Sequence, residues 1–534
     1  MKAIWLRNPK EVTPEEYISF YRSLTKDFGD DKPLAWTHFN AEGDVEFKSV
    51  LFVPPKASPE LFDKYYTNAP QLKLYIRRIF ISDEIEDLLP KYLAFLKGIV
   101  DSDTLPLNVS REMLQQHNSL KTIKKKLIRK ALDMIKRIMD DDPDEIISED
   151  EDGLEEEVEE QTSEKKGKYA EFWKEYGKFI KMGILDDTTN GKRLAKLIRF
   201  QSSKSGEKLI SFDQYVARMK PDQSYIYFIT GQDTNQLEKS PLLEKLLKKE
   251  YEVIYFTDPL DEYVMQHLTE YEEKKLQDAS KDNLKIGGKD SKAKTKELAK
   301  AYKKLTKWWK DILSGENLES VKVSTRLANT PTVVVTSKTG WSSNMERVMQ
   351  AQTFVDSSKV SHMKSKRILE INPRHPIIQE LRQKIAVDPE DDVARQAAAL
   401  LYETALIESG FTLDDPKIFA SRIHSVIKMN LNVDPDAQVQ EEADEVNKDD
   451  DIDFDDNEKT KPDHQEEGHV ISDPEPVDLL TETLGGKEAK EASGIDNENP
   501  TSSSFMGDGD EAQVFKEAVE FSKPDSMLSV NDEL

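Results

Sequence analysis

Apolar positions along the chain follow two spacings, one typical of helices and one typical of strands. Steps of three and four residues predict helices at 12–24, 113–138, 169–182, 298–313, 391–409 and 416–429, and favour another at 83–100. Near-alternating β-branched and aromatic residues predict strands at 45–53, 72–81, 224–230, 252–257 and 331–336. The strands at 224–230 and 252–257 flank a helix at 241–249, an order that predicts a parallel pair joined by a crossover.

This order of elements predicts an α/β (α+β) multi-domain protein. Residues 1–273 are expected to form an α/β domain, and residues 298–433 a second, mixed α/β domain. Lys, Gly, Ser and Asp dominate the stretch between them, so 274–297 is predicted to be a flexible connection. Acidic runs too charged to bury a core predict a disordered insertion at about 140–164 and a disordered acidic tail at 434–534.

The overall composition excludes several classes of protein. The 534 residues include 76 basic and 103 acidic side chains, a net charge of −27, so neither nucleic acid nor an anionic membrane surface is an expected partner. The absence of cysteine excludes disulfides, thiolate nucleophiles and cysteine-based zinc sites. No apolar run approaches the ~18 residues that span a bilayer. The first seven residues reach charge too soon for a signal peptide.

An arginine stands at a predicted helix start within the stretch 105–116. Ser110 is a good N-cap, so Arg111 lies in the first turn, where the helix dipole makes a cation unfavourable by roughly 0.3–1 kcal/mol. A nearby anion would offset that cost, and phosphate suits a guanidinium beside exposed backbone N–H groups. The plainer alternative is a solvated arginine, or one paired with Asp101 or Asp103.

A second candidate surface is the amphipathic segment that follows Trp341. Met345, Val348 and Met349 share one helical face. Methionine provides an adaptable apolar surface of the kind that binds varied partners. Burial in a core is the alternative.

The last two predicted helices carry apolar faces that two helices alone cannot bury. Gly410 is placed to end the first helix and Asp415 to cap the second. Pairing with a second copy of the chain would make a four-helix interface, whereas packing on their own domain is the alternative. The residues assigned to this interface are Leu400, Leu401, Leu406, Phe419, Ile423 and Ile427.

Two further signals lie in the tail. Its aspartate clusters at 449–456 could hold Ca²⁺ loosely, but they lack the spacing and glycine of an EF-hand, and a solvated acidic tail is favoured. The last four residues look like an endoplasmic-reticulum retention signal of the KDEL type: Asn531, Asp532, Glu533 and Leu534. A retention signal without a signal peptide leads us to expect a chain whose amino-terminal part is missing.

Three motifs closely resemble the ninety-kilodalton heat-shock chaperone family: Trp-Leu-Arg-Asn-Pro at 5–9, Leu-Pro-Leu-Asn-Val-Ser-Arg-Glu-Met-Leu-Gln-Gln at 105–116, and Gly-Trp-Ser-Ser-Asn-Met-Glu-Arg at 340–347. The resemblance runs from about residue 3 to about residue 433, and the terminal tetrapeptide points to the lumenal member. It implies an ATP-dependent, stress-responsive chaperone of the endoplasmic-reticulum lumen that binds unfolded clients. Residues 1–273 would be its middle domain, and 298–433 its carboxy-terminal domain, which forms a homodimer. Co-chaperones are possible partners.

The resemblance also assigns roles to residues. It implies that Arg111 reaches the γ-phosphate of ATP held with Mg²⁺ in a separate amino-terminal domain, with Asn108 and Gln115 in support. It implies that clients contact four apolar residues: Trp5, Trp341, Met345 and Met349. In contrast to the family pattern, no nucleotide pocket precedes Trp5.

Without that pocket, the chain alone is expected neither to bind ATP tightly nor to hydrolyse it. No metal site or other catalytic constellation is predicted. The alternative function is a nucleotide-independent dimeric holdase or decoy, with calcium buffering by the tail a distant third.

Overall fold

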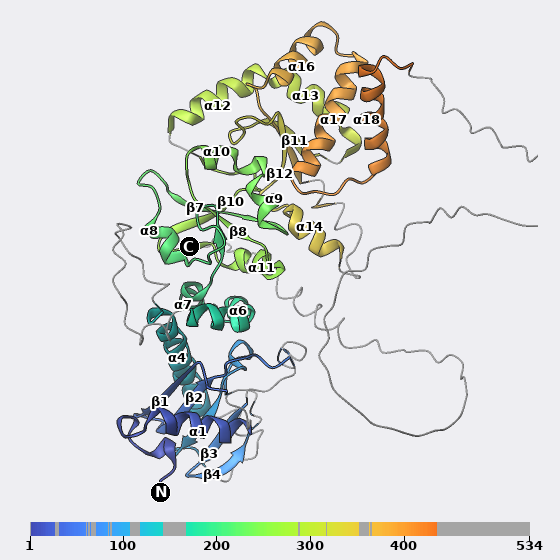
Figure 1. The fold of residues 1–534 in the computed structure, drawn as a ribbon. Coiled ribbons are helices and arrows are strands. Elements are labelled where there is room, and N and C mark those ends of the chain that lie inside the picture. Colours follow the sequence, from blue (N-terminus) through green and yellow to red (C-terminus); the bar gives the residue numbers. More distant parts are fainter. Residues whose placement is uncertain are drawn as a thin grey trace, which may run out of the picture. The chain divides into compact units, whose positions relative to one another are not determined.

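The fold comes from a computed structural model that describes residues 2–434, except 27–30, 60, 62–64, 66–70, 84, 86–87, 107–117, 143–166, 287–288, 317, 352–361 and 364–365. Helices and strands combine in three described sheets, which confirms the predicted α/β (α+β) class. Figure 1 shows the elements coloured in chain order. Short 3-10 helices accompany them: η1 Ile4–Leu6, η2 Pro9–Glu11, η3 Lys91–Leu93, η5 Pro241–Leu243 and η6 Ser314–Glu316.

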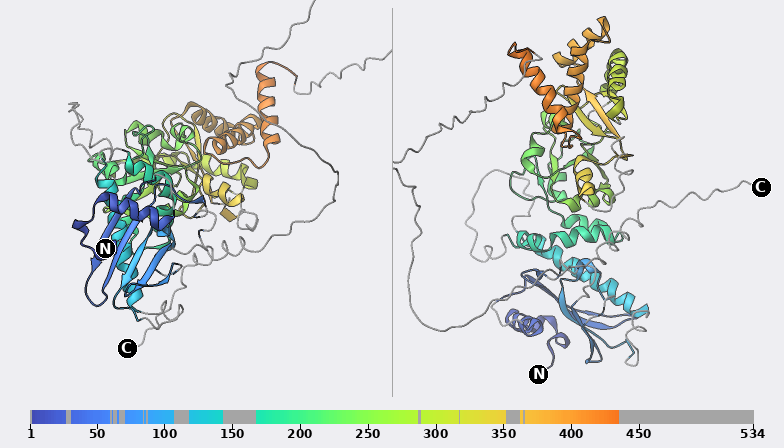
Figure 2. Two further views of the ribbon diagram at one scale, coloured as in Figure 1. Left: turned by 60° about the horizontal axis from the view of Figure 1, so that its bottom comes forward. Right: turned by 90° about the vertical axis from the view of Figure 1, so that its right-hand side faces the viewer.

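The first sheet has the strand order β1, β2, β5, β3, β4. The bounds are β1 Ala35–Ala41, β2 Phe47–Val53, β3 Leu72–Ile76, β4 Ile79–Ser82 and β5 Lys97–Ser102. Neighbouring strands are antiparallel except β3 and β5. Val50 and Phe52 of β2 pack with α1 (Pro14–Thr25), whereas Leu51 and Val53 belong to the core that contains α4 (Asn118–Asp140). Helices therefore cover both faces of β2 (Figure 2, right).

The long helix α4 confirms the predicted three-and-four spacing. Six apolar positions of α4 at this spacing are all buried: Leu120, Ile123, Leu127, Ala131, Met134 and Ile138. On the exposed side of α4, Lys126 donates from its Nζ to the Glu42 carbonyl at 3.0 Å.

Two predictions for the first sheet are wrong. The single strand expected at 72–81 is the hairpin β3–β4, because Arg77 and Arg78 both take left-handed backbone with φ of 49° and 70°. The helix expected at 83–100 is replaced by η3 and β5. Leu88, Leu89, Phe95 and Leu96 are all buried. β5 forms a strand because β2 and β3 complete its backbone hydrogen bonds, which the local pattern could not show.

The second sheet has the order β6, β8, β7, β10, β9. Its strands are β6 Gln201–Ser202, β7 Tyr225–Thr230, β8 Val253–Phe256, β9 Glu270–Tyr271 and β10 Lys274–Asp278. The helices in this part are α6 Lys168–Asp186, α7 Gly191–Leu197, α8 Phe212–Ala217, α9 Thr234–Glu238, α10 Glu244–Lys248 and α11 Pro259–His267. β7 and β8 are parallel, as predicted.

The flexible connection predicted at 274–297 is also wrong for most of its length. Residues 274–278 form β10, whose backbone pairs in parallel with β7. Residues from Lys289 onward form α12 (Lys289–Ala301). Hydrogen bonding to a strand some fifty residues earlier in the chain orders residues 274–278.

The third sheet has the order β11, β13, β12, with bounds β11 Ser320–Val323, β12 Thr332–Thr336 and β13 Arg367–Ile371. Its helices are α13 Lys303–Ile312, α14 Ser343–Gln350, α16 Pro376–Val387, α17 Asp392–Glu408 and α18 Pro416–Asn430. Side chains of β12 and β13 share one buried cluster with β7 and β8 of the second sheet. The second and third sheets are therefore joined by a common core.

Candidate functional site

The predicted phosphate-binding loop runs between the end of β5 and the start of α4. Its three assigned residues lie outside the part of the chain that the structure describes: Asn108, Arg111 and Gln115. On the β5 side, Ser102 Oγ accepts a hydrogen bond from the Leu105 backbone N–H at 3.3 Å and donates one to the Glu46 carbonyl at 3.2 Å. Leu105 is fully buried. The loop therefore starts from a point anchored in the first core.

Trp5 lies beside this anchor. Its indole N–H donates to Asp101 Oδ2 at 2.9 Å, and the backbone N–H of Arg78 donates to Asp101 Oδ1 at 3.1 Å. Asp101 is buried, and both of its carboxylate oxygens accept a hydrogen bond from these two groups. Asp101 is one of the two possible ion-pair partners offered for Arg111. In the structure it accepts the hydrogen bond that orients Trp5.

An apolar surface continues from Trp5 along the β3–β4 hairpin. The Trp5 and Tyr75 ring centroids are 5.4 Å apart, and those of Tyr75 and Phe80 are 5.6 Å apart. Ile79 and Phe80 are 54% and 50% exposed. The strand pattern did not identify Ile79 and Phe80 as surface residues. A local pattern cannot show that β4 lies at the edge of the sheet with one face uncovered.

The methionine face predicted after Trp341 is folded inwards. Ser342 caps α14 by accepting the Met345 backbone N–H at 2.9 Å. Met345 and Met349 are only 7% and 8% exposed, whereas Trp341 is half-buried. In the described state the two methionines are part of the interior.

The carboxy-terminal helices are formed and capped as predicted. Gly410 ends α17 with φ of 83°, and the Asp415 carboxylate accepts backbone N–H groups of Lys417 and Ile418 at 2.9 and 3.2 Å. No residue of α18 is buried. Figure 1 shows α17 and α18 side by side.

The six residues assigned to the dimer interface differ in exposure. Leu406 is 4% exposed and belongs to the domain's own core. Leu400, Leu401, Phe419 and Ile423 are half-buried, and Ile427 is 47% exposed. The structure thus places these residues both inside the domain and on its surface.

Comparison with known families identifies the chain. A model of the Hsp90 protein family matches residues 1–461. The chain belongs to the Hsp90 family. Curated relatives named endoplasmin homolog are 62% identical over 443 residues in Arabidopsis thaliana, 63% over 447 in Catharanthus roseus and 62% over 443 in Hordeum vulgare.

These alignments cover 83% of this Hsp90 chain but only 53% to 54% of each relative. The chain therefore spans about half the length of the curated relatives it matches. Among solved structures, the middle domain of a Plasmodium falciparum heat shock protein is 30% identical, with a TM-score of 0.43 over 52% of this chain and 100% of that one.

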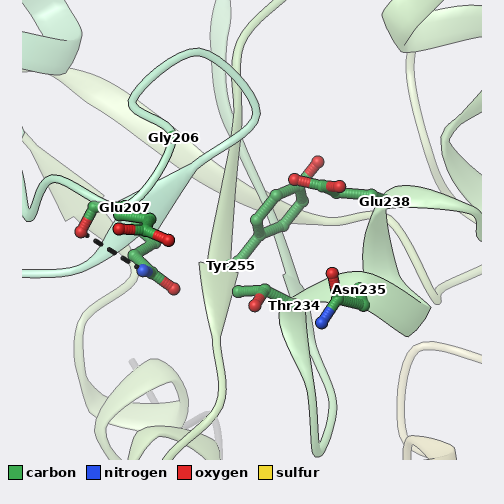
Figure 3. A pocket seen from close by; sticks show the side chains of 7 residues that line it. Gly206, Glu207, Thr234, Asn235, Glu238 and Tyr255 are labelled. Atoms are coloured by element: carbon green, nitrogen blue, oxygen red, sulfur yellow. Dashed lines mark hydrogen bonds between the residues drawn. The ribbon is translucent and has the colours of Figure 1, made fainter.

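A polar cavity of about 430 Å³ lies beside the second sheet of this Hsp90 chain. Its lining comes from β6, β8, α9 and the turn after β6: Gln201, Gly206, Glu207, Thr234, Asn235, Glu238 and Tyr255. Figure 3 shows the Tyr255 ring beside the Glu238 carboxylate. Burial, followed by the nearby Glu238 charge, raises the pKa of Tyr255 to about 12. None of the residues predicted from the sequence lines this cavity.

Two kinds of feature are absent from the residues that the structure describes. Within them, no three His, Cys, Asp or Glu side chains are grouped to hold a metal ion. No described helix combines the length and apolar character needed to cross a membrane. The predicted retention signal lies outside the described residues.

Proposed function

We propose that this chain supplies the middle and carboxy-terminal parts of an ATP-dependent chaperone of the endoplasmic-reticulum lumen. The observation that carries the proposal is the Hsp90 family match across residues 1–461, in a chain whose alignment spans about half the length of its relatives. The final residues Asn531–Leu534 and the relatives named endoplasmin homolog support the lumenal location. In this proposal the clients are unfolded or partly folded proteins, and co-chaperones are further partners.

Arg111 is proposed to complete the ATPase site of a separate nucleotide-binding domain, with Asn108 and Gln115 supporting the loop. ATP with Mg²⁺ would be held by that domain rather than by this chain. A guanidinium near the γ-phosphate stabilises the charge that develops during transfer, an effect worth roughly 10³ to 10⁵ in rate in other nucleotide hydrolases. The buried anchor at Leu105 supports this role because it limits where the loop can start.

Client contact is proposed at two apolar surfaces. One is the continuous ring surface of Trp5, Tyr75 and Phe80. The other is formed by Trp341, Met345 and Met349 on and before α14. Rings and flexible thioethers adapt to many apolar partners, which suits clients that share no sequence.

A homodimer is proposed through α17 and α18. The support is that α18 buries no residue in the single chain while exposing a group of apolar side chains: Ile418, Val426, Ile427 and Met429. A two-fold partner would cover this face and form a four-helix interface.

ATP turnover by the purified chain, alone and with an excess of an Hsp90 amino-terminal domain, tests the composite site. We expect turnover only on mixing, and a fall of about 10³-fold or more with Arg111→Ala. Arg129→Ala is the matched control, since Arg129 is an exposed arginine of α4. Turnover by the mixture that is unchanged by Arg111→Ala would contradict this role.

The second candidate function is a nucleotide-independent dimeric holdase or decoy, favoured by the same exposed face of α18. It predicts that the chain dimerises and suppresses client aggregation. It also predicts no ATP turnover when the chain is titrated with the amino-terminal domain up to saturating binding. Turnover that depends on Arg111 would exclude this alternative.

A further inference from the structure

The helix α14 is docked onto the body of the protein at its amino-terminal end by one buried carboxylate. Glu262, in the first turn of α11, accepts a hydrogen bond from Ser342 Oγ–H at 2.6 Å. The same Ser342 oxygen accepts the Met345 backbone N–H, so one hydroxyl both caps α14 and binds α11. Glu262 and Ser342 are both buried. A hydrogen bond to a buried carboxylate is stronger than one in water.

A second anchor holds the middle of the helix. Arg367 of β13 donates from Nη2 to both carboxylate oxygens of Glu346, at 2.6 and 2.9 Å. The Arg367 guanidinium also lies 4.7 Å from the centre of the Phe411 ring. This anchor joins two opposite charges, whereas the Glu262 anchor joins a charge to a neutral hydroxyl.

The burial of Met345 and Met349 gives the docking a functional consequence. Side chains that are 7% and 8% exposed offer almost no surface to a client. We infer that Glu262 is a positioning residue that holds α14 in a docked state, and that clients reach Met345 and Met349 only after Ser342 leaves Glu262. This inference rests on the proposed client-binding function of the segment.

Substitution of Glu262 tests the docking directly, with hydrogen exchange of the full chain as the readout. Glu262→Ala leaves the Ser342 cap but removes its partner, so exchange at α14 amides should rise about 10-fold or more while α4 amides stay unchanged. Glu262→Gln retains an oxygen that can accept from Ser342 and should have a smaller effect. Glu270→Ala, which removes an exposed glutamate of β9, is the matched control. Unchanged exchange of α14 in Glu262→Ala would overturn the inference.

A reversible lock tests whether client contact needs the movement. A Cβ built on Gly410 lies 3.5 Å from the Ser343 Cβ, within the range of about 3.5–4.5 Å that a disulfide spans. The chain contains no cysteine, so Ser343→Cys with Gly410→Cys introduces a single possible disulfide. Because Gly410 has φ of 83°, the reduced double variant is the reference for any strain.

The probe is a permanently unfolded polypeptide whose cysteines are alkylated. A photoreactive amino acid that replaces Met349 of the chain crosslinks to this polypeptide where the two are in contact. We expect the oxidised variant to crosslink at least about 10-fold less than its reduced form. Equal crosslinking in the two forms would overturn the inference. A third outcome separates the two proposals. If hydrogen exchange shows that Glu262→Ala opens α14 and that the disulfide closes it, the docking by Glu262 stands. If no form then crosslinks to the polypeptide, the proposed client-binding function of this segment fails.

Discussion

At the scale of single residues, Gly98 shows how close strand packing restricts side-chain size. A Cβ added to Gly98 in β5 would lie 2.3 Å from the Val50 carbonyl oxygen of β2. Backbone cannot move aside as a flexible side chain can. The central strands of the first sheet therefore need glycine at this position for their close approach.

Gly98→Ala is expected to lower the free energy of unfolding by about 1–3 kcal/mol, because the added methyl group forces β5 away from β2. Gly191→Ala is the matched control, since no atom lies within 4 Å of a Cβ built there. Urea denaturation followed by circular dichroism measures both changes. A loss of stability in Gly191→Ala as large as that in Gly98→Ala would count against the steric explanation.

Asp261 is a second residue whose surroundings set its chemistry. Lys181 Nζ lies 2.8 Å from Asp261 Oδ1 and 3.1 Å from Asp258 Oδ2, between α6 and α11. Burial of Asp261 outweighs this ion pair and raises its pKa to about 6. The folded protein therefore binds a proton more tightly than the unfolded chain does. The contribution of Asp261 to stability falls as pH rises from about 4 through about 6.

Asp261→Asn should reduce the dependence of the free energy of unfolding on pH between about pH 4 and pH 6. The free energy of unfolding of the wild type, relative to the variant, is expected to fall by roughly 1–3 kcal/mol between pH 4 and pH 7. Chemical denaturation at half-unit pH steps measures the difference. Burial also raises the pKa of Glu262, but Glu262 is present in both proteins, so its effect cancels in the comparison. A parallel pair of profiles would contradict the assignment to Asp261.

At the scale of secondary-structure elements, α18 is a long helix that is attached to the domain without burying a residue. Its polar contacts to the body include the ion pair between Arg422 and Glu403 of α17. Its apolar side chains contribute little to the stability of the single chain. Substitutions there should act on association rather than on folding.

Ile427→Asp is expected to weaken dimerisation by roughly 100-fold, because each copy places an apolar side chain in the proposed interface and a two-fold axis doubles the loss. The melting temperature of the dilute monomer should stay unchanged, since Ile427 is 47% exposed there. Sedimentation velocity over a concentration series measures the association. Ser425→Asp, which adds the same charge at another exposed position of α18, separates a general charge effect from loss of the apolar contact.

At the scale of the whole described molecule, Arg326 joins the second and third sheets. Its guanidinium is completely buried and donates to the Glu370 carboxylate at 3.1 and 3.0 Å, to the Lys281 carbonyl at 2.6 Å, and to the Ala279 carbonyl. Glu370 belongs to β13, whereas Ala279 and Lys281 follow β10. The junction therefore combines the common core with one buried cation that has partners on both sides.

Glu370→Ala should lower the free energy of unfolding by about 3–5 kcal/mol, because it leaves the buried guanidinium without a counter-charge. The exposed pair of Asp282 and Lys322, 3.0 Å apart, is the comparison. Asp282→Ala should cost less than about 1 kcal/mol because water screens that pair. Thermal unfolding of the two variants measures the contrast, and equal losses would contradict a special role for the buried pair.

The sequence alone determined features that depend on near neighbours in the chain. The helices at 169–182, 391–409 and 416–429 were predictable because three-and-four spacing and the caps at Gly410 and Asp415 are local. The family was also predictable, because its motifs are long contiguous runs of residues. The roles of Arg111, Asn108 and Gln115 remain predictions based on those motifs.

Tertiary structure alone decided which apolar residues are buried and which polar stretches are ordered. Residues 97–102 and 274–278 became strands because partners distant in sequence complete their hydrogen bonds. Met349 is buried while Ile427 is exposed, although both follow the same helical spacing. Spacing shows that a helix has an apolar face, but the body that covers this face comes from elsewhere in the chain or from another molecule. That physical limit separates what the sequence determined from what the fold decided.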